Sequence, residues 1–474
     1  MFTSCSFPTS GRPAFVGRIA SGTIALAAAC ALAASPVLAA EPEPGAVVVA
    51  APYALATPPS AAELRRLIES APGLVAGQRL NVGLLRRFYA AHGFEPVWTA
   101  RQVQANSLMN AVLRAGDHGL APELFHTNLL RNTATLSPLD RELLLSDAFL
   151  SYADALARGA MPVERRIEDE ALTPEPIDVA AALDAAIGSP DPAAAIEALA
   201  PTTPTYLALR QVLRNYRSGA AVGDRAMTSR VREIEVNLER QRWLPRRLPQ
   251  DRVWVNAADA KLVLYRGDRP VFSTRIIVGQ DGRPNQTPEF EVAIDGVLFN
   301  PPWNVPESIT REEILPKIGH DPDYLRRHNM VLQPNGGLQQ QPGPGAALGQ
   351  IKFEMENQYD VYLHDTPLKT LFNRDNRRIS HGCIRVQNPR ELAALLMQQS
   401  VDTINQTIAT SGTARINLPA PVPAFMVYQT AFVDTDGSLQ FRPDVYNRDP
   451  EIWSYLYPVG QPVAEREPPG RRRG

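Results

Sequence analysis

The hydrophobic pattern of this 474-residue chain changes near residue 250, and that change constrains its fold class. Before this point, apolar residues recur every three to four positions, which is typical of one buried face of a helix. After it, valines and isoleucines alternate with polar residues between short turn signals, which is typical of strands. We therefore predict an α+β protein, with an all-helical domain over residues 60–245 and a β-rich domain over residues 250–410.

Capping residues mark where several of the helices begin. Ser60 and Glu63 form a capping box, and Ser137 precedes a proline suited to the first helical turn. Asn81 can cap a helix that stops at Gly93. The expected helices start at Ser60 and cover residues 81–93, 137–159, 179–187, 192–199, 206–216 and 230–242.

Alternation and turn residues predict the strands. Residues 253–279 indicate three strands, residues 291–300 a pair, and further strands are expected at 351–353, 361–364 and 424–434. The stretch 305–349 is rich in proline, glycine, asparagine and glutamine, which favours a lid insertion with one helix near 309–318. Residues 411–456 are expected to form a C-terminal extension packed on the β-rich domain, and residues 457–474 a disordered tail.

The N-terminus has the features of an export signal. Arg12 and Arg18 precede an apolar stretch over residues 19–38, and small residues follow it. We predict a signal peptide over 1–40, a flexible linker over 41–59, a periplasmic protein and no stable membrane span after cleavage. A membrane anchor, or a lipoprotein signal ending at Cys30, remains an alternative.

The cysteine count draws attention to one position. Cys5 and Cys30 lie in the predicted signal, which leaves Cys383 as the one thiol of the exported form. Such a thiol is either a nucleophile or a small buried hydrophobe, and the count alone does not decide between these roles. The formal net charge of −2 gives no basic surplus for a nucleic-acid partner.

The residues around Cys383 favour nucleophilic chemistry. Gly382 permits a positive backbone angle and close approach of a substrate. A thiol needs a base, and the two nearby histidines, His381 and His364, are candidates. Two alternatives stay open. Both histidines could be structural hydrogen-bonding groups, or they could bind zinc with Asp365 and Cys383, although the usual paired zinc-ligand spacing is missing.

His364, fifteen residues, then Ser380-His381-Gly382-Cys383-Ile384-Arg385 resembles the signature of the L,D-transpeptidases of bacterial cell-wall synthesis. The segments 287–288, 299–309 and 342–353 agree with this resemblance. Residues 85–98 resemble the helical scaffold of the large periplasmic members. A peptidoglycan-binding module often follows that scaffold, but residues 216–230 are too short to contain one.

The resemblance implies a role for each matching residue. Cys383 would be the nucleophile and His364 the base, its ring oriented by the backbone carbonyl of Asp365. His381, Gly382 and the Cys383 backbone would shape the turn and the oxyanion hole. The expected substrate-binding residues are Arg385, Ser380, Tyr362, Trp303 and Asn304. No cofactor and no metal are implied.

The implied reaction is acyl transfer through a thioester. The thiolate attacks the carbonyl between diaminopimelate and the terminal D-alanine of a tetrapeptide stem, and an amine of a second stem then takes the acyl group to give a 3→3 cross-link. Water as acceptor would make an L,D-carboxypeptidase, and a protein amine would attach an outer-membrane protein to peptidoglycan. A non-catalytic wall-binding scaffold is the alternative from another class.

Overall fold

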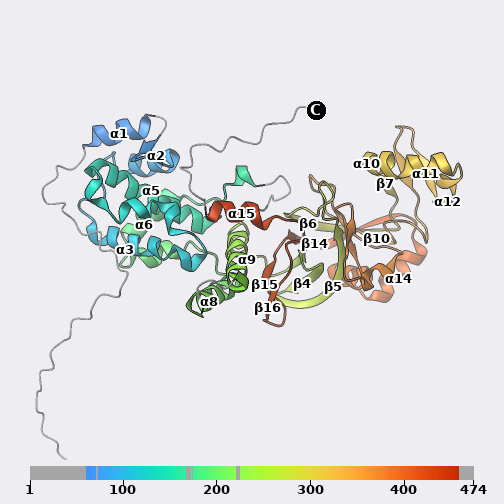
Figure 1. Ribbon diagram of the computed structural model, residues 1–474. Helices are drawn as coiled ribbons and strands as arrows, with labels where there is room; N and C mark the ends of the chain where they lie inside the picture. Colours follow the sequence, from blue (N-terminus) through green and yellow to red (C-terminus); the bar gives the residue numbers. More distant parts are fainter. Residues whose placement is uncertain (1–59, 71–72, 167–171, 173, 220–224, 458–474) are drawn as a thin grey trace, which may run out of the picture. The chain divides into compact units, whose positions relative to one another are not determined.

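The computed structural model describes residues 60–70, 73–166, 172, 174–219 and 225–457 (Figure 1). The predicted signal peptide and linker lie outside these residues, as does the predicted tail from residue 458 onward. Tyr457 does not belong to a disordered tail, because its hydroxyl donates to Glu235 Oε1 at 2.9 Å. None of the described helices is long and apolar enough to cross a bilayer.

The first half of the described chain is mainly helical. Its helices are α1 (Ala61–Glu69), α2 (Val82–Ala91), α3 (Gln102–Leu113), α4 (Thr127–Leu130), α5 (Pro138–Arg158), α6 (Val179–Ile187), α7 (Pro192–Glu197), α8 (Pro204–Gly219) and α9 (Arg225–Arg242). The predicted capping box at Ser60 is present, with both of its hydrogen bonds. Helix α3 was not predicted, because Arg101 stands at its cap position without a side-chain capping bond.

A small hairpin corrects the prediction of an all-helical domain. Strands β1 (Leu74–Val75) and β2 (Gln78–Arg79) pair in antiparallel fashion. Ala76 and Gly77 form the turn, with φ of 47° and 77°. Two consecutive positive angles suit a tight two-residue hairpin, which a search for longer alternating segments does not detect.

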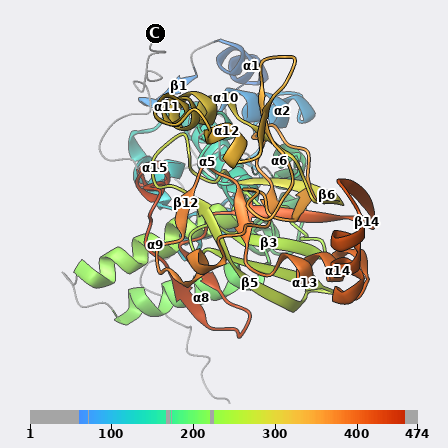
Figure 2. The ribbon, with the colours of Figure 1, turned by 90° about the vertical axis from the view of Figure 1, so that its right-hand side faces the viewer.

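The second half is built on one sheet that closes on itself. Its strands run in the order β12-β5-β13-β11-β10-β6-β14-β3-β4, and β4 also pairs with β5. The bounds are β3 (Arg252–Asn256), β4 (Lys261–Arg266), β5 (Arg269–Gly279), β6 (Phe290–Phe299), β10 (Ile351–Glu354), β11 (Leu363–His364), β12 (Arg378–Ser380), β13 (Ile384–Val386) and β14 (Ala414–Val427). Helices α13 (Pro389–Met397) and α14 (Val401–Thr410) pack against this sheet through a shared core (Figure 2).

Two strand predictions need correction. Residues 290–299 form the single strand β6 rather than a pair, because Gly296 pairs with Glu354 on one side and Asn417 on the other. Residues 424–434 are two strands rather than one. Strand β14 ends at Val427, and β15 (Ala431–Val433) pairs instead with β16 (Leu439–Phe441).

The predicted C-terminal extension is part of the architecture rather than an addition to it. Strand β14 lies between β6 and β3 inside the sheet. Because strand side chains alternate, Ala424 and Met426 join the core of the sheet, whereas Phe425 and Val427 join the core of the helical half. Helix α15 (Asp449–Leu456) adds buried residues to that helical core as well.

The lid is a folded unit rather than a loop with one helix. Strands β7 (Trp303–Val305), β9 (Leu338–Gln340) and β8 (Met330–Leu332) form a small sheet. Beside it lie α10 (Glu307–Ile309), a π-helical stretch (Thr310–Ile314), α11 (Leu315–His320) and α12 (Tyr324–Arg327). Val305, Ile314 and Leu338 form its core. Each of these strands has only three residues, so their alternation was not evident in the sequence.

Candidate active site

The register of three neighbouring strands determines the surroundings of His364. Strand β11 pairs with β10 on one side and with β13 on the other, so that His364 stands opposite both Lys352 and Arg385. Residues directly opposite each other in a sheet share one face. His364 therefore has a cationic residue opposite it on each neighbouring strand.

His364 is held as a neutral imidazole. Its Nδ1 lies 2.6 Å from the backbone carbonyl of Asp365. A carbonyl can only accept, so the proton is on Nδ1 and the lone pair is on Nε2. Burial, followed by the charge of Arg385, lowers the pKa of His364 to about 3. This backbone hydrogen bond to Asp365 is the one expected from the family resemblance.

The carboxylate of Asp365 connects the end of the lid to the His364 strand. It accepts the backbone N–H of Gln350 at 2.9 Å, that of Thr366 at 2.7 Å and the ammonium of Lys369 at 2.7 Å. Gly349 lies against it, and a Cβ there would come within 2.4 Å of Asp365 Cγ. The chain therefore leaves the lid on a path fixed by the residue that orients His364.

A hydroxyl closes the turn that carries the cysteine. Ser380 Oγ donates to the carbonyl of Cys383 at 2.6 Å and accepts the N–H of Gly382 at 3.3 Å. Ser380 is only 2% exposed, so the structure does not support its predicted contact with substrate. Gly382 adopts φ of 111°, as the sequence predicted for this position.

The Cys383 thiol is partly exposed and points toward the chain just before β11. Its Sγ lies 3.6 Å from the backbone carbonyl of Asp360. Burial raises the pKa of the Cys383 thiol, and hydrogen bonding to Tyr362 opposes that rise. The parallel register of β11 with β13 thus brings Cys383 next to Tyr362, and the hydrogen bonds of the thiol go to Asp360 and Tyr362.

Tyr362 stands between these groups. Its ring lies 5.7 Å from the His364 ring, edge to face, and 4.5 Å from the Lys352 ammonium. Burial, followed by the Cys383 thiol, raises the pKa of its hydroxyl, and hydrogen bonding to Trp303 opposes this effect. The structure therefore gathers the predicted Tyr362 and Trp303 at the thiol.

Arg385 and Lys352, the two cationic residues opposite His364, differ in their contacts. Arg385 is partly exposed, and burial lowers the pKa of its guanidinium. Its Nε is buried without a hydrogen-bond partner among the described residues. Lys352, which was not predicted, pairs with Glu354 at 3.1 Å. The register beside His364 identifies it, and that register is set by pairing between distant segments.

Two other predicted residues face the lid. Asn304 is exposed and accepts a hydrogen bond from Gln339 at 2.7 Å, so the structure does not bring it to the cysteine turn. His381 Nε2 lies 2.6 Å from Glu313 Oε1, in the π-helical stretch of the lid. Within the described ranges there is no group of three or more histidine, cysteine, aspartate or glutamate side chains suited to a metal ion.

Comparison with known proteins finds two separate matches along the chain. Residues 83–213 match the model of a scaffold domain, and residues 250–416 match that of an L,D-transpeptidase catalytic domain. A curated protein of Haemophilus influenzae, whose name assigns it to the L,D-transpeptidases, is 32% identical over 242 residues. The match covers 46% of this chain and 48% of that protein, so the chain spans about half the length of this relative.

Solved L,D-transpeptidases are also similar at a distance. One from Mycobacterium smegmatis is 12% identical, with a TM-score of 0.21, over 38% of this chain and 58% of that chain. A mutant of the enzyme from Enterococcus faecium is 9% identical, with a TM-score of 0.18, over 38% of this chain and 50% of that chain. At these TM-scores the likeness establishes no functional correspondence.

Proposed function

We propose that this chain, whose residues 250–416 match the model of an L,D-transpeptidase catalytic domain, is a periplasmic enzyme that uses Cys383 to form 3→3 cross-links between peptidoglycan stems. The observation that carries the proposal is the register of β11 with β13. It sets His364 beside Arg385, two residues from Cys383, with the Nε2 lone pair of His364 unprotonated.

The resting pair is a thiol and a neutral imidazole. The raised pKa of Cys383 and the lowered pKa of His364 both disfavour a thiolate–imidazolium ion pair. His364 would therefore act as a general base during attack, after rotation of the thiol away from Asp360. Catalytic hydrogen bonds of this kind often shorten only when substrate is bound.

The reaction has two steps, acylation of Cys383 and transfer of the acyl group to an amine. The Cys383 thiol gives its proton to His364 Nε2 while sulfur attacks the carbonyl between diaminopimelate and D-alanine. The C–N bond breaks, the D-alanine amine takes the proton from the imidazolium, and a thioester remains. An amine of a second stem then attacks the thioester carbonyl. A new C–N bond forms as the C–S bond breaks, and the proton lost by the amine passes through His364 to the sulfur.

The backbone of the cysteine turn would stabilise the oxyanion. The N–H of Gly382 is engaged by Ser380, and the N–H of Ile384 donates to the carbonyl of Tyr362 at 3.0 Å. The N–H of Cys383 between them is the donor that we assign to the oxyanion. Arg385 and Lys352 would hold the carboxylates of the stem peptide, since arginine pairs with carboxylates in a bidentate manner.

The acceptor is the part of the proposal that admits alternatives. Water would make the same site an L,D-carboxypeptidase, and a protein amine would attach an outer-membrane protein to the wall. A non-catalytic wall-binding role would need neither the thiol nor the imidazole.

Mass spectrometry of purified tetrapeptide muropeptides, incubated with the protein or its Cys383→Ala variant, tests the proposal. We expect a dimer that has lost one D-alanine, formed only by the unaltered protein. A tripeptide monomer alone would indicate the carboxypeptidase. Dimer formation by Cys383→Ala would exclude the cysteine mechanism.

A further inference from the structure

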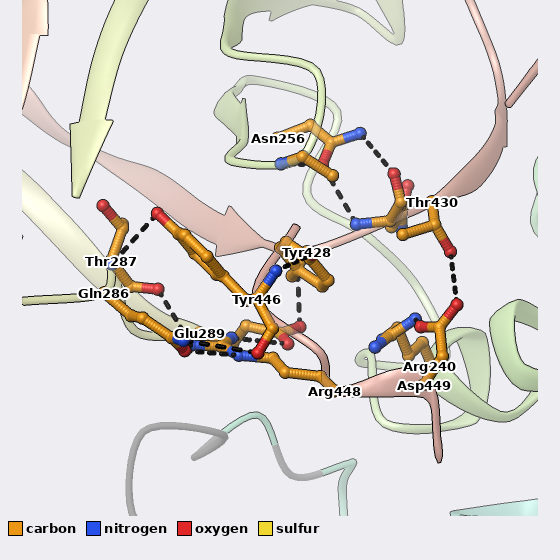
Figure 3. A network of polar contacts seen from close by, with 12 residues as sticks. Arg240, Asn256, Gln286, Thr287, Glu289, Tyr428, Thr430, Tyr446, Arg448 and Asp449 are labelled. Carbon is orange, nitrogen blue, oxygen red and sulfur yellow. Dashed lines mark hydrogen bonds and ion pairs between the residues drawn. The ribbon is translucent and has the colours of Figure 1, made fainter. Parts of the chain in front are cut away.

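A buried arginine from the C-terminal segment fixes the loop beneath the cysteine turn. Arg448 is only 1% exposed, and its Nη1 donates to Glu289 Oε1 at 3.0 Å. Its Nη2 donates to Gln286 Oε1 and to the carbonyl of Thr287, each at 3.2 Å (Figure 3). The rigid geometry of the guanidinium therefore determines the path of the chain between β5 and β6.

Tyr446 holds the same loop from a second point. Its hydroxyl donates to the carbonyl of Gly279 at 2.8 Å and accepts the N–H of Thr287 at 3.4 Å. Its own carbonyl accepts from Gln286 Nε2 at 3.3 Å. Arg448 and Tyr446 thus contact both ends of the loop (Figure 3).

Thr287 connects this loop to the cysteine turn, residues 380–383. Its Oγ1 accepts the N–H of Gly279 at 2.9 Å and donates to the carbonyl of Gly382 at 2.8 Å. The carbonyl of Gly382 and the N–H of Cys383 belong to one peptide unit. In a trans peptide these two groups point in opposite directions. A hydrogen bond that holds the carbonyl on the loop side therefore turns the Cys383 N–H to the other side.

We propose that Tyr446 and Arg448 are positioning residues, which act through Thr287 to fix the Gly382–Cys383 peptide unit with its N–H facing the site. The effect on turnover rests on the proposed function, whereas the orientation of the peptide does not. None of the three side chains titrates or touches substrate in the reaction described above. Their role is to prevent rotation of one peptide unit.

Hydrogen exchange of the full-length protein, followed by mass spectrometry of the peptide that contains residues 380–385, measures how firmly this turn is held. Thr287→Val removes the hydroxyl at nearly constant volume, and Thr287→Ser retains it. Tyr446→Phe removes the hydroxyl that contacts Gly279 and Thr287. Arg448→Lys keeps a positive charge for Glu289 but loses the second nitrogen, which contacts Gln286 and Thr287. We expect exchange in this peptide to rise several-fold in all of these variants except Thr287→Ser.

Thr430→Val is the matched control. Thr430 is a fully buried threonine of the same C-terminal segment, and its hydroxyl contacts Asn237 at 2.6 Å and Asp449 at 3.3 Å, away from the loop (Figure 3). It should lower stability without changing exchange in the cysteine turn. Equal exchange in the turn for Thr287→Val and Thr430→Val would overturn the proposal.

Measurement of kcat and KM distinguishes a loss of positioning in the turn from a general loss of stability. Loss of a well-oriented oxyanion donor lowers kcat by about 100-fold, so partial misorientation should lower it by at least roughly 10-fold with little change in KM. Alkylation of Cys383 by iodoacetamide needs no oxyanion donor and should stay within about 2-fold. A kcat equal to that of Thr430→Val would also contradict the proposal. If the unaltered protein shows no turnover, the proposed function is wrong. Hydrogen exchange of residues 380–385 then still tests whether Thr287, Tyr446 and Arg448 hold the peptide unit.

Discussion

Glu313 Oε1 lies 2.6 Å from His381 Nε2, so a residue of the lid contacts the residue two positions before Cys383. The carboxylate lies in a π-helical stretch, a local irregularity that is common at functional sites. Through this pair, the position of the lid and the shape of the cysteine turn depend on each other.

Glu313→Gln should weaken binding of the donor stem without lowering stability. The two side chains are 41% and 34% exposed, and such ion pairs contribute about 0–1 kcal/mol to folding. We expect KM to change by several-fold and the melting temperature to stay constant. Glu312→Gln is the control, because Glu312 is 67% exposed and pairs with its neighbour Arg311. The same KM for both variants would argue against a role for the lid contact.

Alkylation of Cys383 should show a thiol rather than an ion pair. Because its pKa is raised by burial, the rate with iodoacetamide should keep increasing through pH 9, without a plateau near neutral pH. His364→Ala should lower turnover by roughly 100-fold or more, as expected for loss of a general base. Alkylation at pH 10 should be nearly unchanged in that variant. A rapid phase at pH 6 would instead indicate a thiolate–imidazolium pair.

Stability should fall between pH 6.5 and pH 3, in part because of His364. Its folded pKa of about 3 lies below the unfolded value near 6.5, so only the unfolded chain binds the proton in this range. The contribution of His364 is complete above pH 6.5 and is lost progressively as the pH falls toward 3. The urea midpoint of His364→Gln should therefore depend less on pH than that of the parent protein.

His118 allows an internal comparison for the same experiment. It is buried in the helical half, where burial lowers its pKa to about 2, so it adds a similar dependence. His118→Gln should also flatten the pH profile, but it should leave Cys383 alkylation unchanged. Identical pH profiles for parent and His364→Gln would show that His364 is not held neutral by the fold.

Gly382→Ala should preserve the fold and remove most of the turnover. A Cβ at this position would lie 3.5 Å from the Gln286 carbonyl, an ordinary contact, so the cost is the strain of φ at 111°, about 1–3 kcal/mol. Rotation to relieve that strain moves the thiol and its N–H. Gly437→Ala is the matched control, since Gly437 has φ of 83° and open space around it. A similar fall in melting temperature, with turnover retained in the control alone, is the expected result.

The parts of the fold that depend on interactions between residues close in sequence could be predicted. The capping box at Ser60 and the cap at Ser137 placed their helices, because capping is a local interaction. The resemblance to the L,D-transpeptidases is confirmed by the family model, which matches residues 250–416. Glycine at position 382 was expected to permit a positive backbone angle, and Gly382 adopts one, with φ of 111°.

The parts that depend on long-range pairing did not follow. Strand β14 alternates only weakly along its length, and nothing near it in sequence shows that it pairs with β6 and β3. Lys352 enters the site only through its register with His364. The inward role of Ser380 likewise depends on the turn closing back on itself. These contacts are decided by tertiary structure rather than by local propensity.

The place of β14 inside the sheet determines when the sheet can be completed during synthesis of the chain. A nascent chain emerges from its N-terminus, and the strands that flank β14 are made well before it. Until residue 427 has been synthesised, β6 and β3 lack the partner that lies between them, and residues 446 and 448 follow later still. A protein released early would therefore contain Cys383 and His364 but would lack the strand that completes the sheet around them. The sheet around Cys383 and His364 therefore cannot be complete before β14 has been made.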